Sequence, residues 1–371
     1  MVKRLPGARK AQAQLAGAPS GPTPPQGELR PVVYLPTWAR WDEMRQRPQY
    51  MLSAFARAGH RVYFVDPREP NARHADGVNI VPSLGSVPGS HVILYVHFAP
   101  LAAMFGSFND AVVVYDILDD LSIYDDDEVG MPEERRVRSH HSSVMESADV
   151  VVASAPELIA THQSERDDIM LVENGVEPER FGSVETSPEN MAEIGNPIVG
   201  YHGAVARWFD FALMHGVVEA MPEAQFVVVG PVDGDAERSI GQLEALGNFH
   251  RLDPVPSDEI PEYVAAFDVG LVPFVVDDLT RAVSPLKMYE YLAAGVPVVA
   301  TPLPVCVAHP LVETASTVDA FVDAVRSAIV VRDSEAFISA ADAAADAASW
   351  DSRVDVVRSR LSEQGQLRVP S

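Results

Sequence analysis

The amino-acid sequence predicts an α/β protein made of two successive doubly wound domains. Its 371 residues are enough for two domains with one hydrophobic core each. Short runs rich in valine and isoleucine alternate with helical patterns, which is typical of parallel strands covered by helices on both faces. The alternation stops at one polar stretch, residues 182–196, and then starts again, so this stretch is the predicted interdomain linker.

The first half of the chain contains six predicted strands. They are residues 31–35, 61–66, 91–98, 111–117, 149–154 and a short strand around 170–172. A helix is expected over residues 48–58, because Met51, Leu52 and Phe55 fall on one face and Gly59 can end it.

The second half repeats the same alternation. Its predicted strands are residues 197–203, 225–231, 249–252, 268–274 and 297–302, and its predicted helices are residues 210–221, 257–266 and 285–294. The alanine-rich segment 334–364 is expected to be helical, with an interruption near Ser349 and Trp350.

These patterns divide the chain into four parts. Residues 1–29 are expected to form a disordered tail, because the first 27 residues lack acidic side chains and are rich in Pro, Gly, Ala and Gln. One Rossmann-like domain is expected over residues 30–183, a second over 197–345, and a closing helix over 346–366. The basic residues of the tail could contact an anionic membrane surface, although an inert tail is the simpler interpretation.

Composition argues against several classes of protein. The formal net charge of −25 disfavours nucleic acid as a partner, because phosphate backbones are bound by basic surfaces. No apolar run approaches the ~18 residues that span a bilayer, and we recognise no signal peptide. The single cysteine, Cys306, lies between two valines and is expected to be a buried, small hydrophobic side chain. A single cysteine cannot form an internal disulfide, which favours a reducing, cytoplasmic setting.

Ligands of open parallel sheets bind beyond the carboxyl ends of the strands, and this rule selects candidate residues without any motif. In the first half it selects Trp38, Trp41, Arg45, Arg47, His97, Asp116, Asp119 and Asp120; in the second half it selects residues 202–207, 274–284 and 301–304. We expect these loops to line a cleft between the two domains. Trp38 and Trp41 could stack on an acceptor sugar, or they could be core or lid residues.

The segment from Ser284 to Gly295 is the most informative. Ser284 is a good N-cap, Pro285 suits the first helical position, and Gly295 can end a helix in a left-handed conformation. The start of such a helix offers backbone N–H groups to a phosphate. Lys287, the one lysine outside the predicted tail, could neutralise a diphosphate, and Glu290 on the same face could accept hydrogen bonds from ribose hydroxyls. A salt bridge between the two on a solvated face is the alternative.

The loop after strand 197–203 is the second candidate. Gly203 permits close approach of the backbone, and Arg207 supplies a permanent charge with bidentate phosphate geometry. The sequence contains neither G-x-G-x-x-G nor a P-loop motif, so dinucleotide oxidoreductases and P-loop nucleotidases lose support.

Polar side chains at strand ends in the first half form the third candidate group. Asp116 could orient an acceptor hydroxyl or cap a helix, and His97 could contact a sugar or be a satisfied buried histidine. Asp125 and Asp127 have the spacing of a divalent-cation motif, but they lie in an acidic run of the kind that is usually a solvated loop. We recognise no His or Cys cluster with metal-ligand spacing, so we expect no metal.

Residues 284–304, with the sequence SPLKMYEYLAAGVPVVATPLP, resemble the nucleotide-binding segment of the GT-B glycosyltransferases, specifically the retaining family-four-like group. Four more segments are similar to the corresponding parts of that group and occur in the same order: residues 47–67, 112–122, 173–181 and 199–211. The similarity is closest to glycosyltransferases of teichuronic acid and cell-surface polysaccharide, and it runs over most of residues 31–361. Residues 349–354 look like the start of the terminal helix that returns to the first domain in this fold.

The resemblance implies a role for each candidate residue. Glu290 would hold the donor ribose, and Arg207 and Lys287 would bind the diphosphate. The other residues implied around the donor are Ser284, Pro285, Leu286, Gly203, His202, Arg281 and Thr280, and the predicted catalytic residues are Arg207, Lys287, Asp116 and His97. Many members of the group carry a second glutamate eight positions before the one at 290. Ala282 occupies that position here, so the contact with the donor sugar stays open.

The resemblance therefore implies a glycosyltransferase. It would move a sugar from a nucleoside-diphosphate sugar, held by the second domain, to a glycan or glycolipid acceptor held by the first. Retention of configuration and a place in cell-surface polysaccharide synthesis are implied, in the cytoplasm or at the inner face of the membrane, without a metal or a cofactor other than the donor. The alternatives are an epimerase or hydrolase of nucleotide sugars on the same fold and a non-catalytic nucleotide-binding subunit. A metal-dependent GT-A transferase would leave the second α/β half unexplained.

Overall fold

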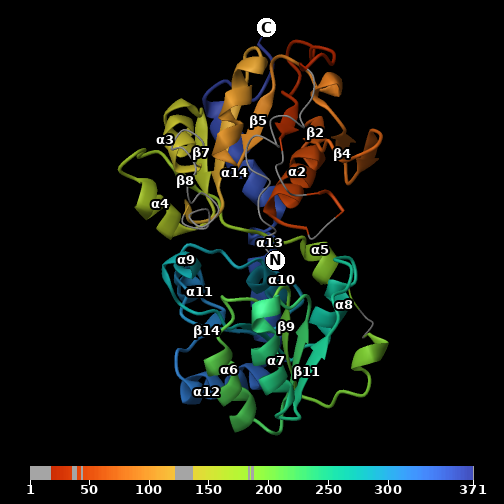
Figure 1. Cartoon of the computed structure of the whole chain (residues 1–371), viewed down its shortest axis with the longest axis vertical. Helices are drawn as coiled ribbons and strands as arrows, with labels where there is room; N and C mark the ends of the chain where they lie inside the picture. The colour runs from red at the N-terminus through yellow and green to blue at the C-terminus, as the bar shows by residue number, and fades with distance from the viewer. Residues whose placement is uncertain are drawn as a thin grey trace. The chain divides into compact units, whose positions relative to one another are not determined.

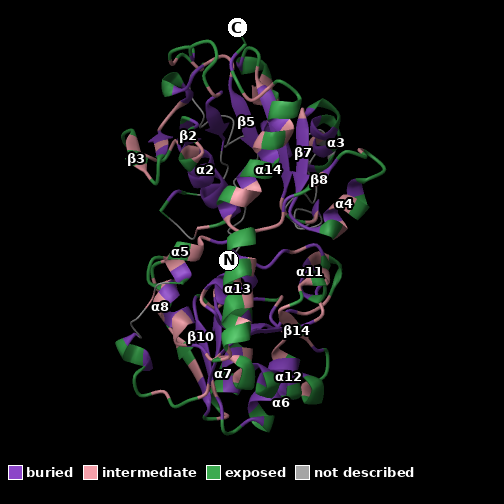
Figure 2. Ribbon diagram, turned by 180° about the vertical axis from the view of Figure 1, so that it is seen from behind, coloured by how far each residue is buried: buried purple, intermediate pink, exposed green. Residues whose placement is uncertain are grey.

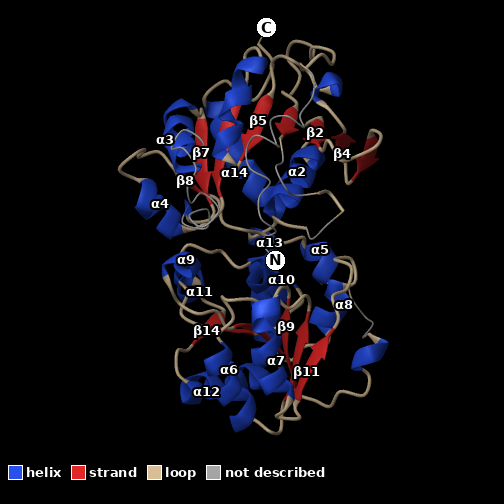
Figure 3. Ribbon diagram, in the orientation of Figure 1, coloured by secondary structure: helices blue, strands red, loops and turns tan. Residues whose placement is uncertain are grey.

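The computed structural model describes residues 18–35, 40–42, 45–121, 137–182, 184 and 188–370. The chain forms two compact units (Figure 1). The N-terminal unit contains the described residues up to Glu173 together with those from Trp350 onward, and the C-terminal unit is Asn174–Ser349. In each unit a central sheet is flanked by helices, which makes both α/β domains (Figure 3).

The N-terminal unit is built on an eight-stranded sheet with the order β3-β4-β2-β1-β5-β6-β7-β8. Its strands are β1 (Val32–Tyr34), β2 (Val62–Val65), β3 (Arg73–Ala75), β4 (Val78–Val81), β5 (Ile93–Val96), β6 (Val112–Ile117), β7 (Val150–Ala153) and β8 (Met170–Leu171). All neighbours pair in parallel except β3 and β4. The central strands β5, β6 and β7 are buried along their whole length (Figure 2), as their uninterrupted apolar sequences predict.

The C-terminal unit is built on a six-stranded, fully parallel sheet with the order β11-β10-β9-β12-β13-β14. Its strands are β9 (Ile198–His202), β10 (Gln225–Val229), β11 (Phe249–Leu252), β12 (Val269–Val272), β13 (Val298–Ala300) and β14 (Val312–Thr314). In chain order this is 3-2-1-4-5-6, the strand order of the Rossmann fold.

Helices cover these sheets. In the N-terminal unit they are α2 (Arg47–Arg57), α3 (Val137–Ser147), α4 (Pro156–His162), α14 (Trp350–Glu363) and the 3₁₀ helices η1 (Leu84–Ser86) and η2 (Ala99–Ser107). In the C-terminal unit they are α5 (Pro178–Phe181), α6 (Phe211–Ala220), α7 (Glu237–Glu244), α8 (Ile260–Ala265), α9 (Asp278–Arg281), α10 (Leu286–Ala293), α11 (Pro304–Ala308), α12 (Val318–Val331), α13 (Glu335–Ala347), η5 (Glu189–Met191) and η6 (Gly234–Ala236).

Helix α14 belongs to the N-terminal unit, although it follows the C-terminal unit in the sequence. The buried indole of Trp350 stacks on Tyr50 of α2, with ring centroids 5.2 Å apart, and Arg57 donates to Asp351 at 2.8 Å. An aromatic stack and an ion pair therefore fix the closing helix on α2.

In each sheet the strand order changes direction beside the first strand, and such switch points are where open α/β sheets bind ligands. The reversal lies between β1 and β5 in the N-terminal unit and between β9 and β12 in the C-terminal unit. Tyr34 and His97 lie at the carboxyl ends of the first strand pair, and His202 and Phe274 lie at those of the second. The fold therefore selects one loop cluster in each unit.

The predicted disordered tail is wrong for the part that the structure describes. The N–H of Gly21 donates to the carbonyl oxygen of Val87 at 2.8 Å, and Leu29 pairs with Arg368 in an antiparallel bridge. These backbone partners lie far along the chain, so composition alone does not reveal them. Residues 1–17 lie outside the described part.

The predicted interdomain linker is also wrong, because the chain passes from one unit to the other between Glu173 and Asn174. Residues 188–196 pack on the C-terminal unit instead: Met191 is buried, and the side-chain amide of Asn190 donates to the hydroxyl of Tyr263 at 3.0 Å. Residues 188–196 are mostly polar because most of their other side chains are exposed to solvent.

Three short strands, β3, β4 and β14, are absent from the prediction. Asp76 and Gly77 join β3 to β4 with φ angles of 51° and 80°, so an Asp-Gly turn of the kind that marks hairpins was present in the sequence. Strand β14 lies at the sheet edge and has no fully buried residue, so it lacks the apolar run that reveals a central strand.

Candidate functional site

The start of α10 differs from the prediction. The helix begins at Leu286, and Pro285 rather than Ser284 occupies the N-cap position. The hydroxyl of Ser284 accepts the backbone N–H of Asn174 at 3.3 Å, and the side-chain amide of Asn174 donates to the Ser284 carbonyl oxygen at 2.6 Å. Ser284 therefore bonds to Asn174, which is distant in the sequence, and does not cap α10. The N–H of Met288 donates to the carbonyl oxygen of Pro285 at 3.2 Å. The N–H groups of Leu286 and Lys287 come before any acceptor within the helix, so this end remains suited to an anion.

The end of α10 confirms the prediction for Gly295. This residue has a φ of 65°, and its N–H donates to the carbonyl oxygen of Leu292 at 2.9 Å. The N–H of Val296 donates to the carbonyl oxygen of Tyr291 at 2.8 Å. These two bonds form the Schellman motif, which fixes the length of the helix and the register of its side chains.

Glu290 is held in a buried, polar environment on α10. Its side chain is 11% exposed, and Oε2 lies 3.1 Å from Nε2 of His202 at the end of β9. Burial would raise the pKa of the Glu290 carboxyl, but His202, Lys287 and Arg180 outweigh burial and hold the pKa below its usual value. A buried carboxylate that stays ionised is a strong acceptor for hydroxyl groups.

Lys287 lies one turn before Glu290 and is held by aromatic rings. Its Nζ is 4.9 Å from the ring centroids of both Tyr201 and Phe274. Burial lowers the pKa of Lys287 to about 8, although Glu290 counteracts this in part. Cation–π contacts retain the ammonium without using its N–H donors, so these stay available to an anion.

Two glycines bring the backbone close to this ammonium. Gly203 follows β9 with a φ of 109°, and a Cβ there would lie 3.8 Å from Nζ of Lys287. Gly230 has a φ of 144° and packs against Gly203, since a Cβ at 230 would lie 2.4 Å from the carbonyl oxygen of Gly203. The loop after β9 therefore needs both glycines to pass close to the lysine.

The remaining candidates around α10 have different environments. Arg207 and Arg281 are exposed, and within the described residues neither guanidinium takes part in a hydrogen bond or ion pair. Thr280 is buried, and its hydroxyl bonds to Val275 and Asp277 in the capping box of α9. Both arginines are free to meet a ligand, whereas Thr280 stabilises the loop that carries Arg281.

In the N-terminal unit His97 follows β5 and stacks on Tyr34 of β1. The ring centroids are 5.3 Å apart, and the tyrosine hydroxyl lies 2.6 Å from Nδ1. Burial lowers the pKa of His97 to about 4, so the imidazole is neutral at pH 7. A neutral imidazole at a switch point can donate to, or accept from, a hydroxyl group.

Asp116 on β6 is fully buried within an ion-paired network. Arg47 donates to both carboxylate oxygens, at 2.8 and 3.1 Å, and the hydroxyl of Tyr95 also bonds to the carboxylate. The same guanidinium donates to the carbonyl oxygen of Glu173 at 3.0 Å. Within the described residues Asp116 caps no helix. Its burial and its bonds to Arg47 and Tyr95 favour a positioning role, and direct contact with an acceptor stays a prediction.

Of the tryptophan and Asp-rich candidates, Trp41 lies in the described part of the chain. Trp41 is buried, packs edge-on against Phe64 and donates to Asp76 at 3.2 Å, so it is a core residue. Trp38 and the predicted D-x-D spacing at 125–127 lie outside the described residues. Cys306 is buried, as expected, and burial raises its thiol pKa to about 12.

Sequence reasoning assigned no role to several residues that shape the site, although Phe274 lies in a loop that the strand-end rule selected. Tyr201 and Phe274 hold Lys287, Asn174 holds Ser284, and Arg180 contributes positive charge near Glu290. Arg180 lies in the segment 173–181 that was singled out by resemblance, but no spacing rule links it to residue 290. Only the fold brings these groups together.

Comparisons with known proteins point to one family. Residues 197–343, which contain α10 and the loop after β9, match the family Glycosyl transferases group 1. A relative from Bacillus subtilis (strain 168), the putative teichuronic acid biosynthesis glycosyltransferase TuaH, is 30% identical over 174 residues. That match covers 45% of this chain and 44% of TuaH, so the chain spans under half the length of this curated relative.

Solved structures match over nearly the whole chain. Sucrose-phosphate synthase from Thermosynechococcus elongatus has a TM-score of 0.63 at 15% identity, covering 91% of this chain and 98% of its own. HepE of Anabaena in complex with UDP has a TM-score of 0.59 at 15% identity, with 90% and 100% covered. The catalytic domain of starch synthase IV from Arabidopsis thaliana, bound to ADP and acarbose, has a TM-score of 0.63 at 12% identity, with 90% and 99% covered.

The fold of this chain is therefore that of the GT-B glycosyltransferases, with two Rossmann-like units. Its segment 197–343 is similar to the glycosyl transferases group 1 family. Among the residues with a described structure, no helix is long and apolar enough to cross a membrane.

Proposed function

We propose that this protein is a glycosyltransferase that moves a sugar from a nucleoside-diphosphate sugar to a hydroxyl group of a glycan or glycolipid. The observation that carries the proposal is the pair formed by Glu290 and Lys287 on α10, at the switch point of a group 1 domain. The ionised carboxylate suits the hydroxyls of a ribose, and the ammonium beside the helix start suits a diphosphate.

The charges around α10 can stabilise the phosphate that leaves when the bond between the sugar and the nucleoside diphosphate breaks. A nucleoside diphosphate leaves with negative charge developing on its β-phosphate, so a transferase needs fixed cations and dipoles there. Lys287, the first turn of α10 and the exposed Arg207 supply them. We infer retention of configuration: the acceptor hydroxyl attacks on the side from which the phosphate departs, and a phosphate oxygen takes its proton. Neutral His97 is then a group for orienting sugar or acceptor hydroxyls in the N-terminal unit.

The ligands bound in the similar structures support a nucleotide donor but leave its base open, since HepE holds UDP and starch synthase IV holds ADP. The relative TuaH supports a place in cell-surface polysaccharide synthesis. We propose that the reaction takes place in the cytoplasm or at the inner membrane face, and that it needs no metal and no cofactor besides the donor.

Glu290→Gln should weaken nucleotide binding by roughly 10- to 150-fold, because a charged hydrogen-bond acceptor contributes about 1.5–3 kcal/mol. Thermal unfolding with UDP, GDP, ADP and TDP, in a chelating buffer, measures this. A nucleotide at ~100 times its dissociation constant adds about 2.7 kcal/mol to the stability of the folded state. We expect one nucleotide to raise the melting temperature of the wild type and to lose about half or more of that effect in the variant.

The matched control is Glu219→Gln, since this glutamate side chain is 70% exposed on α6 of the same unit. The control should respond to the nucleotide like the wild type. An equal melting shift in Glu290→Gln, or no shift with any nucleotide in folded wild type, would contradict the proposal. Product analysis with the identified donor separates the alternatives: a hydrolase or epimerase consumes it without an acceptor, and a binding subunit does not consume it.

A further inference from the structure

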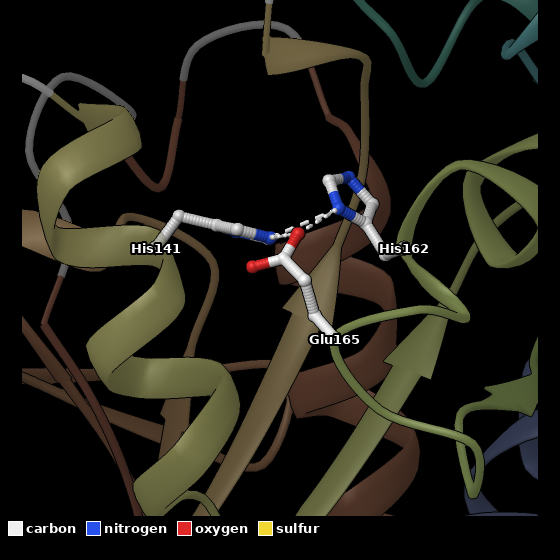
Figure 4. Close-up of side chains that lie close together, drawn as sticks. All are labelled: His141, His162 and Glu165. Carbon is white, nitrogen blue, oxygen red and sulfur yellow. Dashed lines mark hydrogen bonds and ion pairs between the residues drawn. The ribbon is translucent and has the colours of Figure 1, made fainter.

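The N-terminal unit contains a group of three potential metal ligands that the proposed function does not use. His141 lies on α3, His162 is the last residue of α4, and Glu165 follows three residues later (Figure 4). Within the described part of the chain this is the one group of three or more His, Cys, Asp or Glu residues whose ligand atoms all lie within 4.8 Å of one another. The three side chains point toward a common centre.

The spacing of the ligand atoms is that of a tetrahedral site. Nε2 of His141 lies 3.1 Å from Nδ1 of His162, and Oε1 of Glu165 lies 3.0 Å from the latter and 3.8 Å from the former. Zinc bonds of about 2.0–2.1 Å at tetrahedral angles place ligand atoms about 3.3–3.4 Å apart. Two of the observed separations are slightly shorter and one slightly longer, so small rotations of the side chains would bring all three onto one ion.

Neighbouring side chains orient two of the three ligands. The hydroxyl of Tyr115 on β6 lies 2.8 Å from Nδ1 of His141, and the hydroxyl of Ser142 donates to the second carboxylate oxygen of Glu165 at 3.0 Å. Metal-bound imidazoles and carboxylates are typically held in this way by outer partners. With the Nδ1–H of His141 donating to Tyr115, its Nε2 presents a lone pair toward the other two ligands.

The three converging atoms can all act as metal ligands. Both histidines are buried, at 2% and 5% exposure. Nε2 of His141, Nδ1 of His162 and Oε1 of Glu165 lie within 3.8 Å of one another, and each can present a lone pair. A cation would satisfy all three atoms at once.

We propose that His141, His162 and Glu165 form a structural site for a divalent transition metal of the zinc class, which ties α3 to the end of α4 above β6. Two imidazoles and one carboxylate oxygen suit Zn²⁺, whereas Ca²⁺ and Mg²⁺ prefer six or more oxygen ligands. Glu165 is 35% exposed, so a water molecule from this side can complete the tetrahedron.

This site departs from the sequence-based expectation of no metal. The three ligands lie at positions 141, 162 and 165, a spacing with no established metal signature, and α3 and α4 must pack on the same sheet before they meet. The ion proposed here stabilises the N-terminal unit and takes no part in sugar transfer, so its failure would leave the proposed function untouched.

The test is metal binding by the untagged, full-length protein. Titration of the chelator-treated chain with Zn²⁺ and Co²⁺ should show about one equivalent bound, with the visible d–d absorption of tetrahedral Co²⁺, and Zn²⁺ should raise the melting temperature. His162→Gln and Glu165→Gln should each weaken Zn²⁺ binding at least about tenfold, and Tyr115→Phe about 10- to 100-fold through loss of the outer partner. Glu165→Gln is the decisive variant. Because the Glu165 side chain is partly exposed, the substitution should leave the protein folded, and weaker zinc binding would then reflect the loss of a ligand.

His140→Gln is the matched control, since His140 is adjacent to His141 on α3 but lies outside the cluster. It should bind zinc like the wild type. The proposal is overturned if the wild type binds neither Zn²⁺ nor Co²⁺ stoichiometrically, or if Glu165→Gln binds as tightly as the wild type. Binding of Mg²⁺ or Ca²⁺ in preference to Zn²⁺ would overturn it as well. Absence of stoichiometric binding would mean that the cluster is a buried hydrogen-bond network only.

Discussion

Lys287→Met should lower kcat for sugar transfer by about 10²–10³-fold, the loss that follows removal of one fixed donor from a developing negative charge. Lys287 lies 4.9 Å from two aromatic ring centroids and beside the first turn of α10, so its removal takes away a positioned positive charge from the leaving phosphate. Steady-state kinetics with the donor identified by melting shifts measures the effect. A variant with kcat within about threefold of the wild type would show that the ammonium does not face the reacting phosphate.

The lowered pKa of Lys287 also predicts how nucleotide binding depends on pH. The free protein loses this proton near pH 8, whereas a bound diphosphate favours the charged form and raises the pKa. Affinity should therefore change little between pH 7 and 8 and fall about tenfold per pH unit above pH 8, because binding must then take up a proton. Lys287→Arg should remove this dependence, since a guanidinium keeps its proton across the whole range. Isothermal titration calorimetry at several pH values tests both expectations.

A rise in pH should stabilise the unliganded protein, although it weakens nucleotide binding. Between pH 8 and 10.5 the lysine is neutral in the folded state and still protonated in the unfolded state. The unfolded state then binds more protons, so the free energy of unfolding rises with pH in this window relative to Lys287→Met. Denaturant unfolding of both proteins at pH 7.5 and 10 measures the difference. An unchanged difference would show that burial does not perturb this ammonium.

Much of the site in the C-terminal unit could be predicted from the sequence, because its residues lie close together along the chain. Three positions separate Lys287 from Glu290 on one short helix, and Gly295 ends that helix through contacts within a single turn. The valine-rich strands were equally evident, since strands buried on both faces need apolar side chains at every position. Local periodicity and capping therefore place α10 and β9 before any tertiary contact is known.

The parts that could not be predicted depend on contacts between distant segments. Ser284 was expected to cap α10, but Asn174 engages its hydroxyl across 110 positions. Arg47 pairs with Asp116 across 69 positions, and no spacing rule relates the two. Residues 18–29 looked disordered by composition, yet their backbone groups bond to segments near 87 and 368. In each case the partner is determined by the packing of the sheet and not by the nearby sequence.

Asp116→Asn should lower the free energy of unfolding by about 3–5 kcal/mol, since it leaves the guanidinium of Arg47 buried without its counter-charge. That side chain is 4% exposed, and Asp116 is fully buried, so water cannot replace the lost carboxylate. Asp351→Asn is the control, because its pair with Arg57 is 57% and 44% exposed and contributes about 0–1 kcal/mol. Urea unfolding measures both. A loss below about 1 kcal/mol in Asp116→Asn would show that the pair is hydrated in solution.

The same variant distinguishes a positioning role from direct contact with the acceptor. If Asp116 only fixes Arg47 and the hydroxyl of Tyr95, kcat measured well below the melting temperature should stay within a few-fold of the wild type while stability falls. If the carboxylate instead contacts the acceptor, kcat should fall about 10²-fold or more in protein that is still folded. The double variant Arg47→Met, Asp116→Asn should be less destabilised than the sum of the single changes, because no uncompensated charge remains. Additive losses would mean that the two side chains do not stabilise the unit as a pair, and the burial of Asp116 would then need a different explanation.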